Sequence, residues 1–337
     1  MEYKKLGKYG LMVSEIGFGS WISCDDLSKK DASIELIRVA YECGINLFDT
    51  ADAYSQGRAE IILGEALAGY ARGSYVLTTK VYGSTGQGPN ERGLSRKHII
   101  EAIDQSLARL KTDYADIYFC HWFDPNADME ETLRAMDHVV RQGKALYIGV
   151  SNWTAAQIAE GMKICDRLLL YPVAANQPSY NMLDRYIEAE TIPVCERLGI
   201  GQIVYSPLAQ GVLTGKYAIG AEYPKDSRGA LHGGMGAVSV KHYLREDFLR
   251  ITEELKIVAH ECGMLLSQLA LAWVLRKKNV SCALIGASRV EQIRENAAAS
   301  GRAIPDGALR KIDEILAQAG PPVKHNIVKW ENAEHWV

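Results

Sequence analysis

Eight short segments with β-strand character alternate with longer segments of helical spacing along this chain of 337 residues. A strand that is followed each time by a helix is the repeating unit of a parallel sheet. The strand-like segments cover residues 15–19, 45–50, 75–81, 115–121, 145–151, 174–178, 202–207 and 282–288. Eight such units favour a (β/α)8 barrel (TIM barrel), which takes roughly 250 residues and leaves the rest for insertions.

Helical periodicity is clear in several of the intervening segments. A helix is expected over residues 94–110, where apolar side chains recur every three or four residues and Ser95 is a candidate N-cap. Another is expected over residues 129–143, with Gly143 where a C′ glycine belongs. Two more are expected at residues 253–264 and 267–278.

The two ends of the chain add to this barrel. Residues 1–16 predict an N-terminal β-hairpin, and helices extra to the barrel are expected in the C-terminal part. No low-complexity linker divides the chain, so residues 1–337 are expected to form one domain. An open doubly wound sheet is the alternative, but its glycine-rich phosphate loop is missing: the first strand runs into GFGSW rather than GxGxxG.

Composition excludes several classes of function. The net charge is -3, with 38 basic against 41 acidic residues, so no nucleic-acid partner is expected. The seven cysteines are scattered and form no CxxC pair, which argues against disulfides and a structural metal site and favours a cytoplasmic location. The sequence shows no signal peptide, and no apolar stretch reaches the roughly 20 residues of a membrane helix, so no membrane insertion is expected.

Three consecutive strands end in residues that can carry chemistry. Asp49 closes the second strand and Tyr54 follows it, Lys80 lies at the end of the third, and His121 ends the fourth. Taken singly, each has a structural explanation: a loop cap, a packing aromatic, a solvated strand end or a rim histidine. Active sites of parallel barrels form at the C-terminal ends of the strands, so together these residues favour one shared site.

The four side chains suit the reduction of a carbonyl group. A free phenol has a pKa of about 10 and is a weak proton donor at neutral pH. We expect Lys80 to lower the pKa of Tyr54, Asp49 to hold Lys80 charged, and His121 to orient the carbonyl oxygen. The hydride must come from a cofactor, because no side chain supplies one.

The sequence closely resembles the aldo-keto reductase superfamily. The stretch GINLFDTADAYSQGRAEIILGEAL is similar to the superfamily signature around the catalytic Asp and Tyr, and the likeness extends from YKKLGKYGLMVSEIGFGSW to SRVEQIRENAAA. Three further stretches resemble the potassium-channel β-subunit branch: ERGLSRKHIIEAIDQSLARL, DPNADMEETLRAMDHVVRQGKALYIGVSNW and YSPLAQGVLTGKY.

The resemblance implies an NADPH-dependent reductase of aldehydes and ketones on a barrel fold. By motif position Tyr54 would be the general acid, Asp49 and Lys80 would tune it, and His121 would orient the substrate. Animal channel subunits of this branch carry Asn at the position of His121. This chain keeps His, which favours a working enzyme over a regulatory subunit.

The same resemblance implies a cofactor site at the barrel mouth. Ser151, Asn152 and Gln177 would bind the carboxamide of the nicotinamide, and Tyr205 would stack on its ring. The backbone from Ser206 to Gly211 would hold the pyrophosphate. The full set of cofactor residues implied is Ser20, Trp21, Ser151, Asn152, Gln177, Tyr205, Ser206, Pro207, Leu208, Gln210, Gly211, Lys216, Arg228, Gly286, Ser288, Gln292, Glu295 and Asn296.

The adenosine end of that site bears on the choice of cofactor. Ser288 is expected to open the eighth helix and to reach the 2′-phosphate of NADPH, with Arg289 and Arg228 as candidate cationic partners. Ala287 and Ile293 stand where the superfamily commonly has Lys and Arg, so NADH is the alternative cofactor. The structural explanation of this segment is an ordinary solvated amphipathic helix.

Three aromatic residues, Trp21, Tyr82 and Trp122, follow the first, third and fourth strands and are candidates for an apolar substrate pocket or for rim packing. The C-terminal tail with Trp330 and Trp336 is expected either to cover the mouth or to pack on a neighbouring subunit.

Two other functions stay open. One is a cofactor-sensing subunit that binds a potassium channel, as the branch resemblance implies; channel subunits of this branch form tetramers, so a homotetramer is expected. The other is a phosphosugar isomerase or aldolase in which Lys80 forms a Schiff base.

Overall fold

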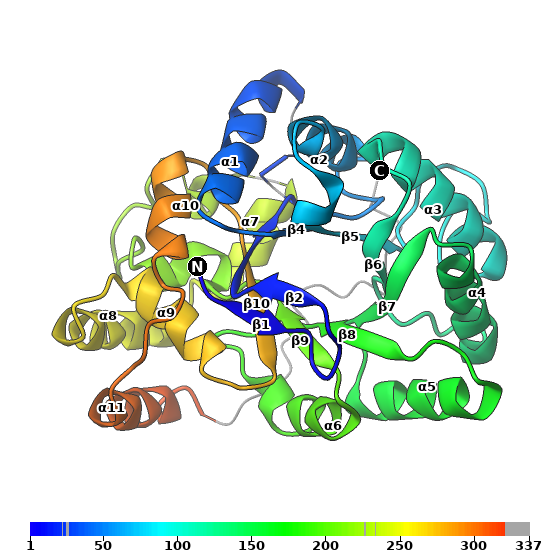
Figure 1. Cartoon of the computed structure of the whole chain (residues 1–337). Coiled ribbons are helices and arrows are strands. Elements are labelled where there is room, and N and C mark those ends of the chain that lie inside the picture. The colour runs from blue at the N-terminus through cyan, green and yellow to red at the C-terminus, as the bar shows by residue number, and fades with distance from the viewer. Residues whose placement is uncertain (22, 25–26, 226, 233, 321–337) are drawn as a thin grey trace.

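The computed structural model describes residues 1–320 except residues 22, 25–26, 226 and 233. Eight parallel strands close into a barrel in the order β10-β3-β4-β5-β6-β7-β8-β9, with helices around it (Figure 1). The strands are β3 (Ile16–Gly19), β4 (Leu47–Asp49), β5 (Val76–Val81), β6 (Ala115–Cys120), β7 (Ala145–Ser151), β8 (Val173–Gln177), β9 (Gly201–Val204) and β10 (Val280–Ile285). The predicted barrel is confirmed, and the open-sheet alternative is wrong because the first and last strands of the barrel pair with each other.

An antiparallel hairpin of β1 (Tyr3–Lys5) and β2 (Met12–Ser14) precedes the barrel, as predicted. In Figure 1 the hairpin crosses the middle of the barrel at its near end. Its turn is packed tightly on the start of β9, because Lys8 N–H donates to the Gly199 carbonyl and a Cβ on Gly7 would lie 2.3 Å from that same oxygen. The hairpin thus covers the N-terminal end of the barrel and leaves the C-terminal end for the site.

Helices follow most strands. They are α1 (Lys30–Glu42), α2 (Arg58–Leu67), α3 (Arg96–Leu110), α4 (Met129–Arg141), α5 (Ala155–Leu168), α6 (Thr191–Leu198), α7 (Gly234–Lys241), α8 (Glu246–Glu261), α9 (Leu266–Leu275), α10 (Val290–Ala297) and α11 (Asp306–Ala317). The 3-10 turns are η1 (Leu27–Lys29), η2 (Arg72–Ser74), η3 (Tyr186–Glu188), η4 (Ala209–Thr214) and η5 (Arg228–Ala230).

The predicted helix ends are partly right. The Ser95 side chain accepts a hydrogen bond from His98 N–H at the start of α3, and Gly143 follows α4 with a φ of 72°. Ser288 does not open the last barrel helix. The helix α10 begins at Val290, because Arg289 is extended (φ −146°) and occupies the N-cap position.

Extra helices lie beyond the regular repeat. The segment after β9 contains α7, α8 and α9, and α11 lies beyond α10 and is tied to α8 by ion pairing of Lys311 with Glu261. The tail that carries Trp330 and Trp336 lies outside the described residues.

Alternation along the strands decides which side chains enter the barrel. On β5, Val76 packs in the apolar cluster inside the barrel, whereas Leu77 and Val81 pack in the clusters between the strands and the helices. Residues two apart share a face, so Thr78 and Lys80 point inward with Val76. The barrel interior is therefore polar toward the C-terminal ends of the strands and apolar toward their N-terminal ends.

No single helix among the described residues is long and apolar enough to cross a membrane. Helices α8 and α9 reach the length and composition of a membrane span only when they are taken together, and the chain bends by 88° between them. The residues Cys43, Cys120, Cys165, Cys195, Cys262 and Cys282 are free cysteines.

Candidate active site

The structure brings the four residues at the strand ends into direct contact. Lys80 Nζ lies 2.6 Å from Asp49 Oδ2 and 3.2 Å from Tyr54 Oη, inside the top of the barrel. Tyr54 Oη in turn lies 3.5 Å from His121 Nε2. Asp49 ends β4, Lys80 lies on β5, His121 follows β6, and Tyr54 lies in the loop between β4 and α2. The side chains therefore form a chain from a carboxylate through an ammonium group to a phenol and an imidazole.

Lys80 is a fully buried cation with three acceptors. Its ammonium group donates to Asp49, to the Thr50 carbonyl at 2.7 Å and to Tyr54. Burial alone would lower the pKa of Lys80, but the Asp49 carboxylate and the Tyr54 hydroxyl outweigh burial and raise it. The residue stays charged, and all three of its protons are engaged.

The pKa of Tyr54 differs from the expectation. Burial raises the pKa of the phenol, and the Lys80 cation lowers it but does not compensate, so the pKa lies above its ordinary value of 10. The prediction of a lowered pKa is wrong, because it considered the neighbouring charge and not the loss of hydration. Lys80 nevertheless remains the strongest influence that favours the phenolate.

His121 is a neutral imidazole. Burial and the Lys80 cation hold the pKa of His121 well below its usual 6.5. A neutral imidazole can donate one hydrogen bond from its N–H while carrying no charge. Its position beside Tyr54 therefore provides a second donor next to the phenol.

Asp49 is held by residues beyond the four. The hydroxyl of Thr78 and the side-chain amide of Gln177 donate to its Oδ1 at 2.6 Å and 2.8 Å. Thr78 was not among the residues predicted from the sequence. Its place two residues before Lys80 on the same strand face was the signal that could have found it.

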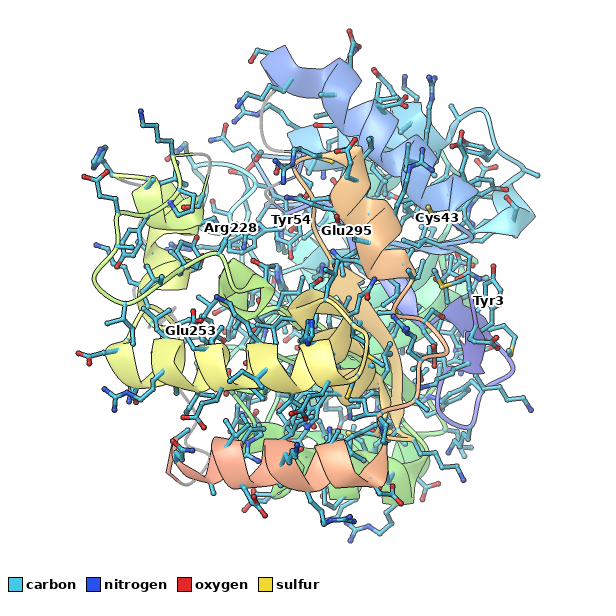
Figure 2. The ribbon with its side chains drawn as sticks, turned by 90° about the vertical axis from the view of Figure 1, so that its left-hand side faces the viewer. Tyr3, Cys43, Tyr54, Arg228, Glu253 and Glu295 are labelled. Atoms are coloured by element: carbon cyan, nitrogen blue, oxygen red, sulfur yellow. The ribbon has the colours of Figure 1, made fainter. Side chains whose placement is uncertain are left out.

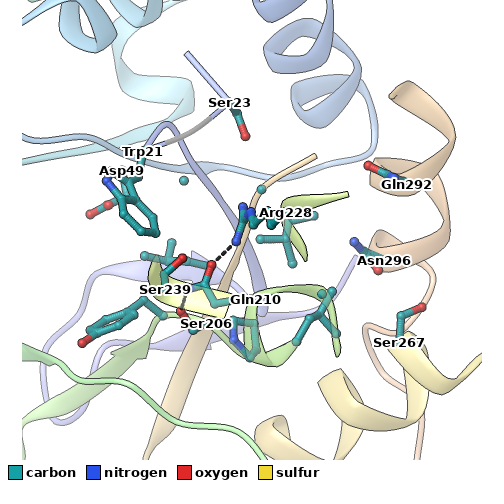
Figure 3. Close-up of a pocket in the computed structure, with 18 of the residues that line it drawn as sticks. Trp21, Ser23, Asp49, Ser206, Gln210, Arg228, Ser239, Ser267, Gln292 and Asn296 are labelled. Carbon is teal, nitrogen blue, oxygen red and sulfur yellow. Dashed lines mark hydrogen bonds between the residues drawn. The ribbon is translucent and has the colours of Figure 1, made fainter. Parts of the chain in front are cut away.

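A cavity of about 500 Å³ opens above these residues. Figure 3 shows side chains that line it, and Figure 2 labels Tyr54, Arg228 and Glu295, which border it from the loop before α2, from η5 and from α10. The predicted residues that line the cavity are Trp21, Asp49, Tyr54, His121, Trp122, Ser151, Asn152, Gln177, Tyr205, Ser206, Pro207, Leu208, Gln210, Gly211, Lys216, Arg228, Gly286, Gln292, Glu295 and Asn296.

Four of the predicted residues lie elsewhere. Lys80 is buried beneath the cavity floor, and Ser20 is buried at the end of β3, where its N–H donates to the Asp49 carbonyl. Tyr82 packs against the apolar cluster between the strands and helices α3 to α5. Ser288 lies outside the lining, and its hydroxyl is within 3.3 Å of Gln292 Oε1, so it contacts a lining residue instead.

The inner part of the cavity has oriented amide groups. The Tyr205 hydroxyl donates to Asn152 Oδ1 at 2.9 Å, and Asn152 Nδ2 donates to Ser151 Oγ at 2.9 Å. Ser151 Oγ donates to the Gln177 carbonyl at 2.7 Å. This network fixes the direction of the amides and of the Tyr205 ring before anything binds.

The middle of the cavity is a backbone concavity. Ser206, Ala209, Gln210 and Gly211 all have positive φ values, of 53°, 47°, 57° and 96°. Successive positive φ values of this kind are typical of an anion-binding nest, and here the Ala209 and Gly211 N–H groups donate to the Ser206 and Leu208 carbonyls within the turn. Lys216 and Arg228 line the cavity beside it, and the Arg228 guanidinium donates to Gln210 Oε1, as Figure 3 shows.

Further lining residues come from parts of the fold that strand-end reasoning does not reach. They are Ser239 on α7, Leu265 to Ser267 at the start of α9, Thr214, Ser23 and Arg289. Of these residues, only Arg289 was predicted from the sequence. Within the described residues, no group of three or more His, Cys, Asp and Glu side chains could hold a metal ion.

Comparisons with known proteins agree with this geometry. Residues 15–317 match the model of the aldo/keto reductase family. A probable voltage-gated potassium channel subunit beta of Arabidopsis thaliana is 44% identical over 300 residues, covering 88% of this chain and 90% of that protein. Its counterpart in Oryza sativa subsp. japonica is 43% identical with the same coverage. The chain therefore belongs to the aldo/keto reductase family.

Proposed function

We propose that this protein is an NADPH-dependent reductase that converts aldehydes and ketones to alcohols, with Tyr54 as the general acid. The observation that carries the proposal is the position of the Tyr54 hydroxyl at the cavity, 3.2 Å from the Lys80 ammonium group and 3.5 Å from the His121 imidazole. A hydroxyl placed there can protonate a carbonyl oxygen, and the adjacent cation stabilises the oxygen anion that it leaves.

Each residue of the site has a defined part in this reaction. A bound nicotinamide supplies the hydride that no side chain can. Tyr54 gives its proton to the carbonyl oxygen, and Lys80 stabilises the resulting phenolate through the hydrogen bond that it already makes. Asp49 balances the buried charge of Lys80. Neutral His121 donates a hydrogen bond to the same carbonyl oxygen and orients it.

The chain also has the groups that a dinucleotide needs. Ser151, Asn152 and Gln177 would hold the carboxamide, with the Tyr205 ring against the nicotinamide. The nest from Ser206 to Gly211 suits a pyrophosphate, because its positive-φ backbone lines the cavity beside the cations Lys216 and Arg228. Gln292, Glu295 and Asn296 on α10 would hold the adenosine.

Arg289 favours NADPH over NADH. It stands at the N-cap of α10 and lines the outer end of the cavity, so its guanidinium can reach a phosphate on the adenosine ribose. Gln292, which accepts from Ser288 N–H at 2.9 Å, lies in the same turn. A guanidinium group pairs with a phosphate through two parallel hydrogen bonds, which a ribose hydroxyl cannot match.

The substrate would be a small carbonyl compound with apolar character. Trp21 and Trp122 line the cavity, and the Trp122 ring stacks beside His121 at a centroid distance of 6.4 Å. A Schiff-base role for Lys80 does not suit the structure. Its pKa is raised, its three protons are engaged, and a nucleophilic lysine needs the opposite.

The test is the loss of NADPH absorbance with a panel of aldehydes, namely 4-nitrobenzaldehyde, methylglyoxal and glyceraldehyde, repeated with NADH. Tyr54→Phe removes the proton donor and little else, so it should abolish turnover and keep cofactor binding, as followed by fluorescence. Turnover that survives in Tyr54→Phe would overturn the role of Tyr54.

A second function is favoured by the two plant relatives, which are named as channel β subunits. In that case the protein would bind a potassium channel as a homotetramer and use the cofactor as a signal. The catalytic function ranks first because the proton-donating residues, including His121, are all in contact. Free cysteines suit a cytoplasmic site of action for either function.

Light scattering of the purified protein measures the oligomeric state. Capture of the protein by the cytoplasmic domain of a potassium channel, in fixed stoichiometry and without turnover of any aldehyde, would move the assignment to the channel subunit.

A further inference from the structure

An ion pair outside the barrel joins the three elements that surround the catalytic loop. Arg109 Nε on α3 lies 2.6 Å from Glu60 Oε2 on α2, and Glu60 is fully buried. The other carboxylate oxygen of Glu60 accepts from the Thr79 hydroxyl on β5 at 2.6 Å. One buried carboxylate therefore links α2, α3 and β5.

This link lies directly behind Lys80. Thr79 and Lys80 are neighbours on β5 and point to opposite faces of the strand. Glu60 holds Thr79 from the helix side, while Lys80 reaches Tyr54 Oη at 3.2 Å from the barrel side. Glu60 thus fixes the strand at the residue next to the one that contacts the phenol.

The same pair holds the turn that follows Tyr54. Ser55, Gln56 and Gly57 all have positive φ values, of 50°, 56° and 81°, and the Tyr54 carbonyl accepts from Gly57 N–H at 3.1 Å. Non-glycine residues in this region carry backbone strain that the surroundings must hold in place. The Arg109 side chain packs against Gly57 so closely that a Cβ there would lie 2.7 Å from Arg109 Cδ.

Charge adds to the constraint on Arg109. Asp52 is buried near Glu60, and burial together with the Glu60 charge raises the pKa of Asp52 well above its usual range. Arg109 is the cation in contact with Glu60. Loss of Arg109 would leave a carboxylate uncompensated in the layer behind the site.

We propose that Arg109 is a positioning residue for carbonyl reduction: with Glu60 it sets the separation of Lys80 and Tyr54 by holding β5 on one side and the Tyr54 turn on the other. The inference rests on the proposed function, in which Tyr54 is the proton donor. A displacement of about 1 Å at reacting groups can lower a rate roughly 100-fold. Arg109→Met and Glu60→Gln should therefore lower kcat about 10- to 100-fold while the Kd for NADPH changes little.

The chain offers a matched control at the other end of the same strand. Arg72 Nη2 lies 2.7 Å from Asp116 Oδ2, its side chain is 22% exposed like that of Arg109, and Asp116 accepts from Leu77 N–H on β5. This pair lies toward the N-terminal end of the barrel, where residues serve stability rather than chemistry. Arg72→Met should lower the melting temperature. Its kcat should stay within about two-fold of that of the wild type, because the activation barrier hardly changes.

A pH profile separates positioning from general damage. Reduction needs the protonated phenol, so kcat falls as pH rises through the pKa of Tyr54 in the complex. A longer distance to Lys80 weakens the influence that lowers this pKa. The falling limb of the profile should therefore move to higher pH in Arg109→Met and Glu60→Gln, stay in place in Arg72→Met, and return toward the wild-type position in Arg109→Lys.

The experiment measures kcat, KM, the NADPH Kd and the pH profile of the full chain with 4-nitrobenzaldehyde, alongside Tyr54→Phe. If Tyr54→Phe is inactive while Arg109→Met keeps a near-wild-type kcat and an unshifted pH profile, only the positioning role is overturned. An active Tyr54→Phe overturns the proposed function instead. Should Arg109→Met not fold, Glu60→Gln and Gly57→Ala disturb the same contact, and an unchanged profile in both would refute the inference.

Discussion

Lys80 and Tyr54 are joined inside the barrel by a hydrogen bond of 3.2 Å from the ammonium Nζ to the phenol oxygen. The two residues come from different segments, β5 and the loop before α2, so their separation depends on the barrel rather than on local sequence. The Asp49 carboxylate completes the unit at 2.6 Å from Nζ. Activity and stability should therefore both depend on Lys80.

Lys80→Met tests this double dependence. The substitution leaves Asp49 without its buried partner, which should cost about 3–5 kcal/mol of the free energy of unfolding. It also removes the group that stabilises the phenolate, so kcat should fall about 100-fold or more. Denaturant unfolding and aldehyde reduction measure the two effects.

Two further variants sharpen that test. Asp49→Asn combined with Lys80→Met removes both charges, so it should regain part of the stability and none of the activity. Lys97→Met breaks an exposed pair with Glu101, whose side chains are 56% and 53% exposed, and should change stability by less than about 1 kcal/mol. A Lys80→Met protein with wild-type kcat would contradict the assigned role.

The stability of the protein should depend on pH through His121. Its pKa is held well below 6.5 in the folded protein by burial and by Lys80, whereas the unfolded chain takes up the proton near pH 6.5. Because the unfolded state binds the proton first, stability falls as pH drops below about 7, at up to about 1.4 kcal/mol per pH unit for one group. The loss continues down to the folded pKa.

His121→Asn removes this titration and keeps a neutral polar side chain. Unfolding by urea at pH 7.5, 6.5 and 5.5 should show a smaller loss of stability in the variant than in the wild type. His98, whose pKa is also lowered by burial, contributes equally to both proteins and cancels in the difference. Parallel pH dependences would mean that the pKa of His121 is not lowered in the folded protein.

The barrel was predictable because each strand–helix unit carries its own pattern in sequence. The ends of the barrel strands were harder to predict. Residues 202–207 were expected to continue as a strand, but β9 ends at Val204, and Ser206 has a φ of 53°. That reversal begins the positive-φ turn from Ser206 to Gly211, and nothing in the local apolar pattern signals it.

The contacts among Asp49, Tyr54, Lys80 and His121 could be expected from one rule, that parallel strands deliver their last side chains to a common edge. The raised pKa of Tyr54 could not be expected from the sequence, because burial is a property of the assembled barrel and outweighs the charge of Lys80. Ser239 and Ser267 escaped notice for a related reason. They lie on helices of the segment after β9, and chain order does not say which helices border the mouth.

Cofactor preference should depend on Arg289. Arg289→Gln keeps a polar side chain but removes the cation at the N-cap of α10, so the Kd for NADPH should rise about 10- to 100-fold, the worth of a hydrogen bond to a charged group. The Kd for NADH should change little, because NADH lacks the 2′-phosphate. Fluorescence titration with both cofactors measures the ratio of the NADPH Kd to the NADH Kd.

Arg294→Gln is the matched control for that substitution. Arg294 lies on the same helix, is exposed, and does not line the cavity, so its loss removes an equal charge without a contact. Equal weakening of NADPH binding by both variants would show that general electrostatic attraction, rather than a contact of Arg289, selects the cofactor.

A buried carboxyl group beneath the nest should also make stability depend on pH, in the opposite sense to His121. Asp184 is 1% exposed and accepts from the Ser179 hydroxyl at 3.1 Å, and burial raises its pKa to about 7 despite that hydrogen bond. Its neighbour Asn181 donates to the Ser206 carbonyl at 3.1 Å, which connects this group to the nest.

The sign follows from the raised pKa. The folded protein holds the proton of Asp184 above pH 4, where the unfolded chain has lost it, so stability is lost as pH rises from about 4 through about 7. Asp184→Asn cannot ionise and should escape this loss. The variant should gain stability over the wild type between pH 5 and pH 8, by at most about 4 kcal/mol, because one pKa unit is about 1.4 kcal/mol.

Urea unfolding of both proteins at pH 5, 6.5 and 8 checks the prediction, with the exposed Asp166→Asn as the control for a charge change at the surface. A difference that widens with pH in Asp184→Asn and stays flat in Asp166→Asn supports a carboxyl group that is protonated in the folded state. A constant difference would mean that Asp184 is already ionised at pH 5, and that the polar groups around it stabilise the charge more than burial disfavours it.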